Sequence, residues 1–243
     1  MLSRFQYPLV FQPGEKWAYG TGIDWAGLLI ERLTNSTLEG YMQSNIWTPL
    51  GIKTMTFFPS RNPDLSARIP VLSLRGTDGG LHPFKEPFIT TGVTGCFGGQ
   101  GIYSSMGDYL KFLRSLLTSD SKILRSDSVN ELFRPQLTPS QAQTQRAIFL
   151  SPVGALFIGE FEMQKYQHGW SFGGIVFTES YQDGRRKAGA VSWGGAANCF
   201  WLVDREAGIA LTFGTQVIPP GDRGVKEVIS MVEKQIYAMA GVA

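Results

Sequence analysis

Apolar residues recur every three or four positions in two stretches near the start of the chain, which is the spacing of amphipathic helices. The first stretch covers residues 24–34 and the second covers residues 36–47. Ser36 and Glu39 have the spacing of a capping box at the start of the second helix. Residues 51–95 are rich in proline and glycine, so we expect an extended region with little regular structure there.

The helical spacing returns in the middle of the chain. Residues 105–118 predict a helix with Ser105 as its N-cap, and residues 126–133 predict a shorter one. After Pro139 the sequence changes character and becomes rich in Gly, Val, Ile and Phe. These residue types predict strands at 149–159 and 169–179.

Residues 185–217 contain three short runs of β-branched and aromatic residues separated by turn residues, which predict three antiparallel strands. The turn at residues 204–208 ends in a glycine, as hairpin loops often do. Gly194 and Gly195 lie in the first of these strands. They indicate either the close approach of a ligand or another backbone, or a β-bulge without a chemical role. Residues 224–240 predict a closing helix that packs on the sheet.

This order of elements predicts an α+β fold, because helices come first and strands follow without βαβ alternation. We expect a helical and loop region at residues 1–140 and an antiparallel sheet with a C-terminal helix at residues 141–243. The two parts should pack as one unit.

The composition excludes several classes of partner. The 22 Lys and Arg residues nearly balance 20 Asp and Glu residues, and the basic residues are dispersed, so neither nucleic acid nor an acidic membrane is expected as a partner. The chain has no apolar run of membrane-spanning length and its start lacks the apolar core of a secretory signal, so we expect a soluble, cytoplasmic protein. Cys96 and Cys199 are expected to be free thiols, although a disulfide between them stays open.

Histidines and glycines give little support for catalytic or cofactor motifs. His82 and His168 stand far apart, and the chain has no Gly-x-Ser-x-Gly elbow and no metal-ligand spacing. The run Gly98-Gly99-Gln100-Gly101 is too irregular to bind a phosphate, and we interpret it as a tight entry to the following helix. We therefore expect no cofactor and no metal.

Tyr19 is the strongest candidate for chemistry. It lies in Trp17-Ala18-Tyr19-Gly20-Thr21, between a turn and a helix, where a side chain can project into a cleft from a fixed backbone. A loop tyrosine on its own is most often a packed aromatic residue with its hydroxyl in water. The later Trp193-Gly194-Gly195 strand motif favours the functional interpretation.

Taken together, these motifs resemble the penicillin-binding and class C β-lactamase-related serine hydrolases. The resemblance is carried by residues 13–21, by the segment from Gly98 to Tyr109, and by the Trp-Gly-Gly motif with Asn198, Trp201 and Asp204. It extends over nearly the whole chain and is closest to the esterase and fungal polyketide transesterase branch, which includes lovastatin acyltransferase-like enzymes. The resemblance implies a serine β-lactamase/DD-peptidase-like fold and ester hydrolysis or transesterification, with a role in polyketide secondary metabolism.

The resemblance also implies roles for individual residues. Tyr19 would be the general base or proton relay, with Thr21 in place of the usual Asn or Ser. The Lys-Thr-Gly strand of the family would be replaced by Trp193-Gly194-Gly195, and the amide of Ala196 would form half of the oxyanion hole. An acyl or polyketide-like small molecule would bind beside the aromatic residues near the strands, including Trp170, Trp193 and Trp201.

The nucleophile motif of the family is absent from the place where the resemblance implies it. The family's nucleophile lies in a Ser-x-x-Lys motif well before the tyrosine, whereas the one such string here is Ser119-Asp120-Ser121-Lys122, in a polar loop. The resemblance therefore implies an N-terminally incomplete chain that is inactive in acyl transfer. Two alternatives stay open: a short-form enzyme that uses Tyr19 for a non-acyl reaction, and a non-catalytic binding module. The uncharged strand from Ala210 to Val217 would be an open sheet edge, which predicts a homodimer or other self-association.

Overall fold

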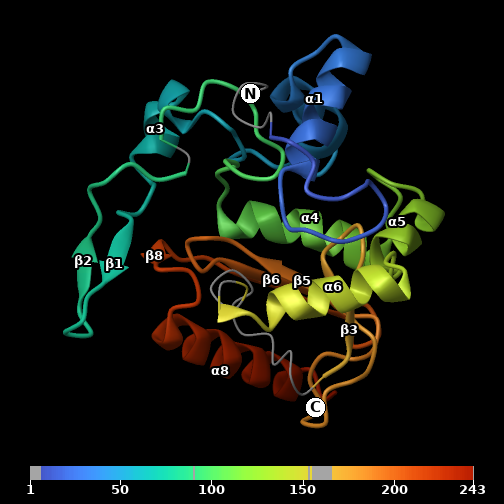
Figure 1. The fold of residues 1–243 in the computed structure, drawn as a ribbon. Helices are drawn as coiled ribbons and strands as arrows, with labels where there is room; N and C mark the ends of the chain where they lie inside the picture. The colour runs from blue at the N-terminus through green and yellow to red at the C-terminus, as the bar shows by residue number, and fades with distance from the viewer. Residues whose placement is uncertain (1–6, 90, 153, 155–165, 243) are drawn as a thin grey trace.

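The structure, a computed structural model, describes residues 7–89, 91–152, 154 and 166–242. Its centre is a five-stranded antiparallel sheet with the order β3-β4-β5-β6-β7. The strands are β3 (His168–Trp170), β4 (Ile175–Phe177), β5 (Val191–Gly194), β6 (Phe200–Asp204) and β7 (Ile209–Phe213). Helix α8 (Arg223–Met239) covers one face of this sheet and helix α4 (Met106–Thr118) covers the other (Figure 1). The α+β class and the three antiparallel strands predicted at residues 185–217 are confirmed.

The alternation of side chains along β5 and β6 divides the residues between the two faces. Trp193 lies directly opposite Trp201 in the β5–β6 register, and Ser192 lies opposite Leu202. Directly opposite residues share a face, so the two tryptophans lie together and Leu202 points the other way. Leu202 is fully buried in the core that includes Ile229 of α8. The tryptophans therefore belong to the α4 side of the sheet.

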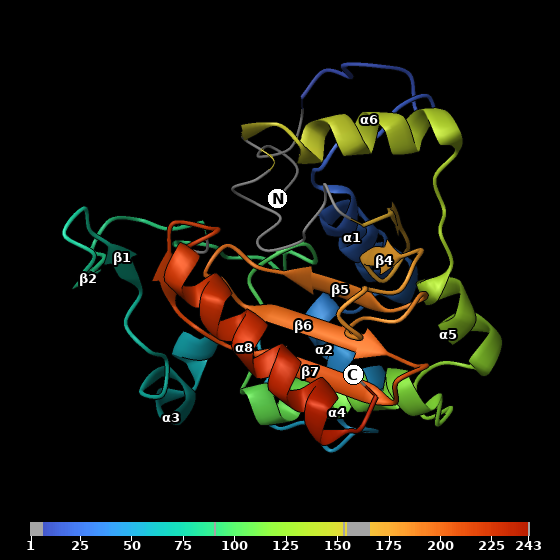
Figure 2. The same cartoon turned by 90° about the horizontal axis from the view of Figure 1, so that it is seen from below.

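Helix α8 forms where the spacing of apolar residues predicted it. Asp222 caps its first turn, because Asp222 Oδ1 accepts a hydrogen bond from the Val225 amide at 2.9 Å. Val225, Ile229 and Tyr237 are buried against the sheet. Seen from below, the helix runs across β6 and β7 (Figure 2).

A second core lies under the N-terminal helices α1 (Gly22–Thr34) and α2 (Leu38–Met42). Helix α2 continues directly into the π-helical turn η2 (Gln43–Trp47). These helices are confirmed, but the predicted cap is wrong. Thr37, not Ser36, caps α2, with its hydroxyl accepting from the Gly40 amide at 3.0 Å. Glu39 points elsewhere, since its carboxylate accepts hydrogen bonds from the hydroxyl of Thr56 and the amide of Phe57.

Helix α4 begins as expected. Ser105 caps it by accepting from the Asp108 amide at 3.3 Å, and Asp108 in turn accepts from the amides of Lys53 and Thr54 at 2.8 Å. The loop after η2 is thereby fixed to the start of α4. Helix α5 (Ser126–Phe133) also has its predicted bounds.

In residues 51–89 and 91–95, the described part of this region, the elements are short. They are a 3-10 turn (Pro59–Arg61), α3 (Pro63–Ser66) and a hairpin of β1 (Ser73–Arg75) and β2 (Leu81–Pro83), which projects from the body of the molecule in Figure 1. Strand β1 pairs in parallel with β8 (Val217–Ile218). This parallel pairing was not predicted, because two-residue strands leave no periodic signal.

Two strand predictions need correction. Residues Pro139–Phe149 form helix α6, which opens with a complete capping box between Thr138 and Gln141. The predicted strand at 149–159 is wrong where it can be seen, at 149–152 and 154, and its remainder lies outside the described residues. The single strand expected at 169–179 is instead the β3–β4 hairpin, whose turn is held by bonds of Ser171 to Gly174.

Candidate functional site

The side chains of Tyr19 and Trp193 lie against each other, although they are far apart in the sequence. Their ring centroids are 5.6 Å apart and their planes are inclined by 38°. Tyr19 comes from the loop that leads into α1, and Trp193 comes from β5. The fold therefore brings the two motifs that the sequence singled out to one place.

A cluster of aromatic side chains packs against Tyr19 and Trp193 and holds the two rings in place. Trp17 is buried and meets Phe149 and Trp170 edge-on at centroid distances of 5.2 and 5.3 Å. Trp170 also meets Trp193 edge-on at 4.9 Å. Such edge-to-face contacts hold each ring in one orientation. Trp170 was expected near the strands but not specifically beside Trp193, and Phe149 was missed because its segment was assigned to a strand.

Tyr19 is half-exposed, and three effects act on its hydroxyl. Burial is the largest and raises the pKa of Tyr19 above its ordinary value. A hydrogen bond from the Trp193 side chain opposes this shift, and the negative charge of Asp24 adds to it. Asp24 is itself buried in the first turn of α1, where its carboxylate accepts from the Gly99 amide at 3.0 Å.

Thr21 stands at the N-cap position of α1, but its side chain makes no capping hydrogen bond. Gly98 and Gly99 pass close to this first helical turn. A Cβ atom on Gly98 would lie 2.6 Å from the Ile23 carbonyl oxygen. The glycine run is therefore structural, but it packs against α1 and is not the entry to α4.

The turn between β5 and β6 carries Ala196. Gly195 N donates to Cys199 O and Asn198 N donates to Gly195 O, both at 2.9 Å, which closes a short loop. Within the part of the chain that the structure describes, the backbone amide of Ala196 donates no hydrogen bond. A Cβ atom on Gly194 would lie 2.9 Å from the carbonyl oxygen of Cys199, the residue before β6, so the approach of this backbone itself requires glycine at position 194.

Asn198 holds this turn in place. It is buried and has a left-handed backbone conformation, with φ of 58°. Its Nδ2 donates to the carbonyls of Val217 and Pro219 at 2.7 and 2.8 Å, and its Oδ1 accepts from the amides of Gly221 and Asp222. The amide side chain is therefore fully used in joining the β5–β6 turn to the segment before α8.

The remaining candidate residues are more peripheral. Trp201 is half-buried and lies opposite Trp193 in the β5–β6 register. His168 stacks on Phe149 at 6.1 Å, and burial lowers its pKa. His82 lies on the exposed β1–β2 hairpin beside Asp78. Nowhere in the described residues do three metal-binding side chains come together.

The Ser119 to Lys122 string lies at the turn after α4. Ser119 is the C-cap of that helix, and its hydroxyl accepts from the Arg205 guanidinium at 3.2 Å. Lys122 is exposed, and its ammonium lies 3.6 Å from Asp120. The Ser119 hydroxyl therefore accepts a hydrogen bond from a cation, and no base among the described residues accepts its proton. Cys96 and Cys199 are both free thiols.

Comparison with known proteins assigns the class. The Beta-lactamase family profile matches residues 4–229, so the chain belongs to the β-lactamase family. It is 36% identical over 240 residues to Monacolin J acid methylbutanoyltransferase of Aspergillus terreus (strain NIH 2624 / FGSC A1156), a match covering 97% of this chain and 57% of that protein. It is also 36% identical over 225 residues to Lovastatin esterase of Penicillium rubens, covering 90% of this chain and 55% of that protein.

Solved structures agree with this assignment. Simvastatin Synthase (LOVD) from Aspergillus terreus, in its LovD6 mutant form, matches with a TM-score of 0.92 and 36% identity over 99% of this chain and 60% of that one. The chain thus spans a little over half the length of these relatives. The expected resemblance to the esterase and transesterase branch and the expected fold are confirmed. Among the described residues, none of the helices has the length and apolar character needed to cross a bilayer.

Proposed function

We propose that this chain carries the tyrosine and strand-turn part of a serine esterase or acyltransferase site that acts on esters of acyl or polyketide-like groups. The observation that carries the proposal is the direct contact of Tyr19 with Trp193 beside a turn whose Ala196 amide donates to no described group. The relatives at 36% identity include an acyltransferase and an esterase, which supports this class of reaction.

Each part of this arrangement suits acyl transfer. Tyr19 moves the proton, and the Ala196 amide stabilises the negative charge that develops on the carbonyl oxygen in the transition state. Thr21, Gly194 and Gly195 line the approach, and Trp170, Trp193 and Trp201 provide the apolar surface for the acyl group. Trp193 stands where a penicillin-recognising site has a lysine that pairs with the substrate carboxylate, so ester chemistry is favoured over β-lactam hydrolysis.

The nucleophile is proposed to come from polypeptide outside the 243 residues. Ser119 does not serve, because its hydroxyl accepts from Arg205 and no described base accepts from it. An activated serine needs a neighbouring base that takes its proton. The non-acyl reaction and the binding module remain as alternatives, and each predicts that a longer gene product adds no esterase activity.

The test compares this chain with the longest product of its gene that includes it. Both are assayed with p-nitrophenyl butyrate and treated with a serine-directed phosphonate, followed by mass spectrometry. We expect neither a burst nor a label in the 243-residue chain, and both in a product that contains an upstream Ser-x-x-Lys. A label on Ser119, or no activity in a longer product, would overturn the proposal.

Tyr19→Phe in the active product should lower kcat by ~10²-fold or more, as expected for the loss of an acid-base group. Tyr41→Phe, a half-buried tyrosine of α2, is the control that should keep normal turnover. Equal turnover in the two variants would return Tyr19 to a purely structural role.

A further inference from the structure

The indole of Trp193 contributes a polar contact as well as an apolar surface. Its side chain hydrogen bonds to Tyr19. An indole N–H only donates, so Tyr19 Oη must be the acceptor in this bond. One lone pair of the phenol oxygen is thereby engaged by β5, and the phenol proton must be directed to a different group.

We infer that Trp193 is a positioning residue for Tyr19: its indole, held in β5 against Trp170 and Phe149, fixes the phenol in the place where it passes a proton. The chemical role rests on the proposed acyl transfer. The hydrogen bond and the field of Asp24 are properties of this chain alone.

Packing gives the indole a fixed direction. Trp170 meets it edge-on at 4.9 Å with the planes at 88°, and Phe149 lies nearly parallel to it at 6.4 Å. Its backbone is held in β5 opposite Trp201. Tyr19 is flanked by Trp17, with the ring centroids 6.4 Å apart. A donor and an acceptor on such supported rings hold the phenol oxygen in one place.

Electrostatics decides the ionisation state of Tyr19. A hydrogen bond from a neutral indole favours the phenolate, but burial and the charge of Asp24 both disfavour it, and the pKa of Tyr19 is raised overall. Asp24 cannot easily turn away, because it is buried in α1 and holds the Gly99 amide. The phenol therefore keeps its proton at neutral pH, which suits a relay and not a preformed base.

The relay balances without a further reagent. In the first half-reaction the seryl hydroxyl passes its proton to Tyr19 Oη, while the Tyr19 proton passes to the departing alkoxide oxygen. The bond from serine Oγ to the acyl carbon forms, and the original ester C–O bond breaks. Water or an acceptor alcohol then attacks the acyl-serine, gives its proton to Tyr19 Oη, and the Tyr19 proton returns to serine Oγ.

The hydrogen bond is tested by NMR on ¹⁵N-labelled chain at neutral pH. The Trp193 indole resonance is assigned by its loss in Trp193→Phe. We expect it to move upfield in Tyr19→Phe, which removes the acceptor but keeps the ring, and to stay in place in Tyr41→Phe. An unmoved resonance in Tyr19→Phe would overturn the inference.

The opposing effects are tested by titrating the ¹³Cζ resonance of Tyr19. Trp193→Phe should raise the Tyr19 pKa further, and Asp24→Asn should lower it while its side-chain oxygen still accepts from Gly99. Trp201→Phe, on the same face of the sheet, should leave it unchanged. Circular dichroism at each pH checks that the chain stays folded, and shifts in the same direction in the first two variants would contradict the inference. The NMR results can hold while none of the longer products of the gene has esterase activity. In that case the proposed function fails and the positioning role of Trp193 stands.

Discussion

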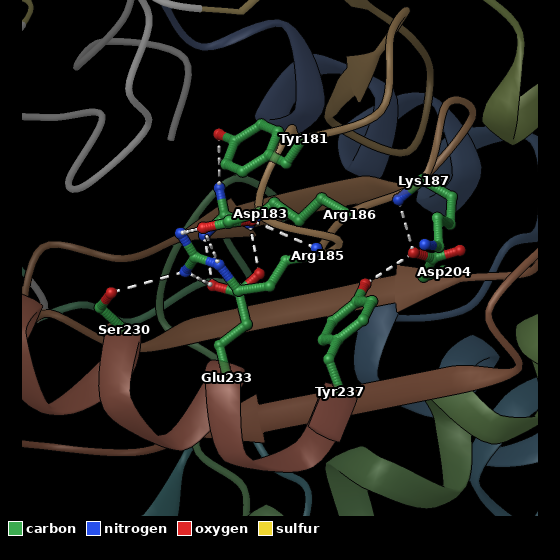
Figure 3. A network of polar contacts seen from close by, with 9 residues as sticks. All are labelled: Tyr181, Asp183, Arg185, Arg186, Lys187, Asp204, Ser230, Glu233 and Tyr237. Atoms are coloured by element: carbon green, nitrogen blue, oxygen red, sulfur yellow. Dashed lines mark hydrogen bonds and ion pairs between the residues drawn. The ribbon is translucent and has the colours of Figure 1, made fainter. Parts of the chain in front are cut away.

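Arg186 and Glu233 form an ion pair in which both side chains are buried (Figure 3). Arg186 Nη2 lies 2.7 Å from Glu233 Oε2, and Arg185 Nη1 approaches the same oxygen at 3.3 Å. Arg186 also donates to the Tyr181 hydroxyl at 3.1 Å. One carboxylate of α8 thus neutralises charge on the loop that precedes β5, and through it α8 is fixed to the strand that carries Trp193.

We predict that Glu233→Gln destabilises the fold strongly, because it leaves the buried Arg186 guanidinium without its counter-charge, whereas Arg185 keeps its ion pair with Asp183. Removing one partner of a buried pair costs about 3–5 kcal/mol of unfolding free energy. Urea denaturation measures the change. Glu227→Gln removes the exposed partner of Arg223 in the same helix and should leave stability near that of the parent. Similar midpoints for the two variants would contradict the prediction.

Asn198 offers a second test, because its amide joins the turn of Ala196 to the segment before α8. In Asn198→Gly the left-handed backbone is still allowed, but two carbonyls and two amides lose their partner. Each buried group left unsatisfied costs about 1–3 kcal/mol, so we expect a loss of several kcal/mol. Asn35→Gly is the matched control, since Asn35 is exposed and also left-handed, with φ of 52°. A loss no larger than that of the control would show that water replaces these bonds.

These two networks mark the limit of what the sequence could predict. Helices α1, α4, α5 and α8 follow from the spacing of their apolar residues, and the strands β5 to β7 follow from their turns. The motifs of Tyr19 and Trp193 were singled out together from the sequence, but the contact between their rings was not predicted. Nothing in the spacing pairs Arg186 with Glu233 or Asn198 with Asp222, because such contacts depend on tertiary geometry. Helix α6 was missed because its apolar residues are few and its start is encoded mainly in Thr138 and Gln141.

Gly98→Ala should destabilise the chain. The added Cβ atom would lie 2.6 Å from the Ile23 carbonyl oxygen, and a backbone atom in the first turn of α1 cannot move aside cheaply. Overpacking of this kind costs about 1–3 kcal/mol. Gly107→Ala, in the first turn of α4, meets nothing within 4 Å and should stabilise the fold by about 0.5–1 kcal/mol. Thermal melts of the two variants should therefore shift in opposite directions from the parent, and a shared direction would contradict the prediction.

The pair of Arg75 and Asp222 predicts a pH dependence. Arg75 donates two hydrogen bonds to the Asp222 carboxylate, at 2.8 and 3.0 Å, and this holds the Asp222 pKa below its ordinary value. A depressed pKa in the folded state contributes stability that is present above the unfolded value of about 4 and is lost as the pH falls through the folded value. Asp222→Asn should remove this part of the acid sensitivity while still capping α8. Parallel denaturation curves from pH 7 to pH 3 would show it, and equal acid sensitivity in both proteins would refute it.

The last prediction concerns β7, which stands at the end of the five-strand order with β6 as its one strand partner among the described residues. Its sequence from Ile209 to Phe213 has no charge and no proline, so nothing in it blunts pairing with another strand. We therefore expect the purified 243-residue chain to self-associate through this edge, with a two-fold dimer as the closed arrangement. Thr212→Lys places a charge on the edge and should weaken association, whereas Thr118→Lys adds the same charge at the exposed end of α4 and should not. Light scattering over a range of concentrations measures this, and a monodisperse monomer of 26.8 kDa in the parent chain would refute the expectation.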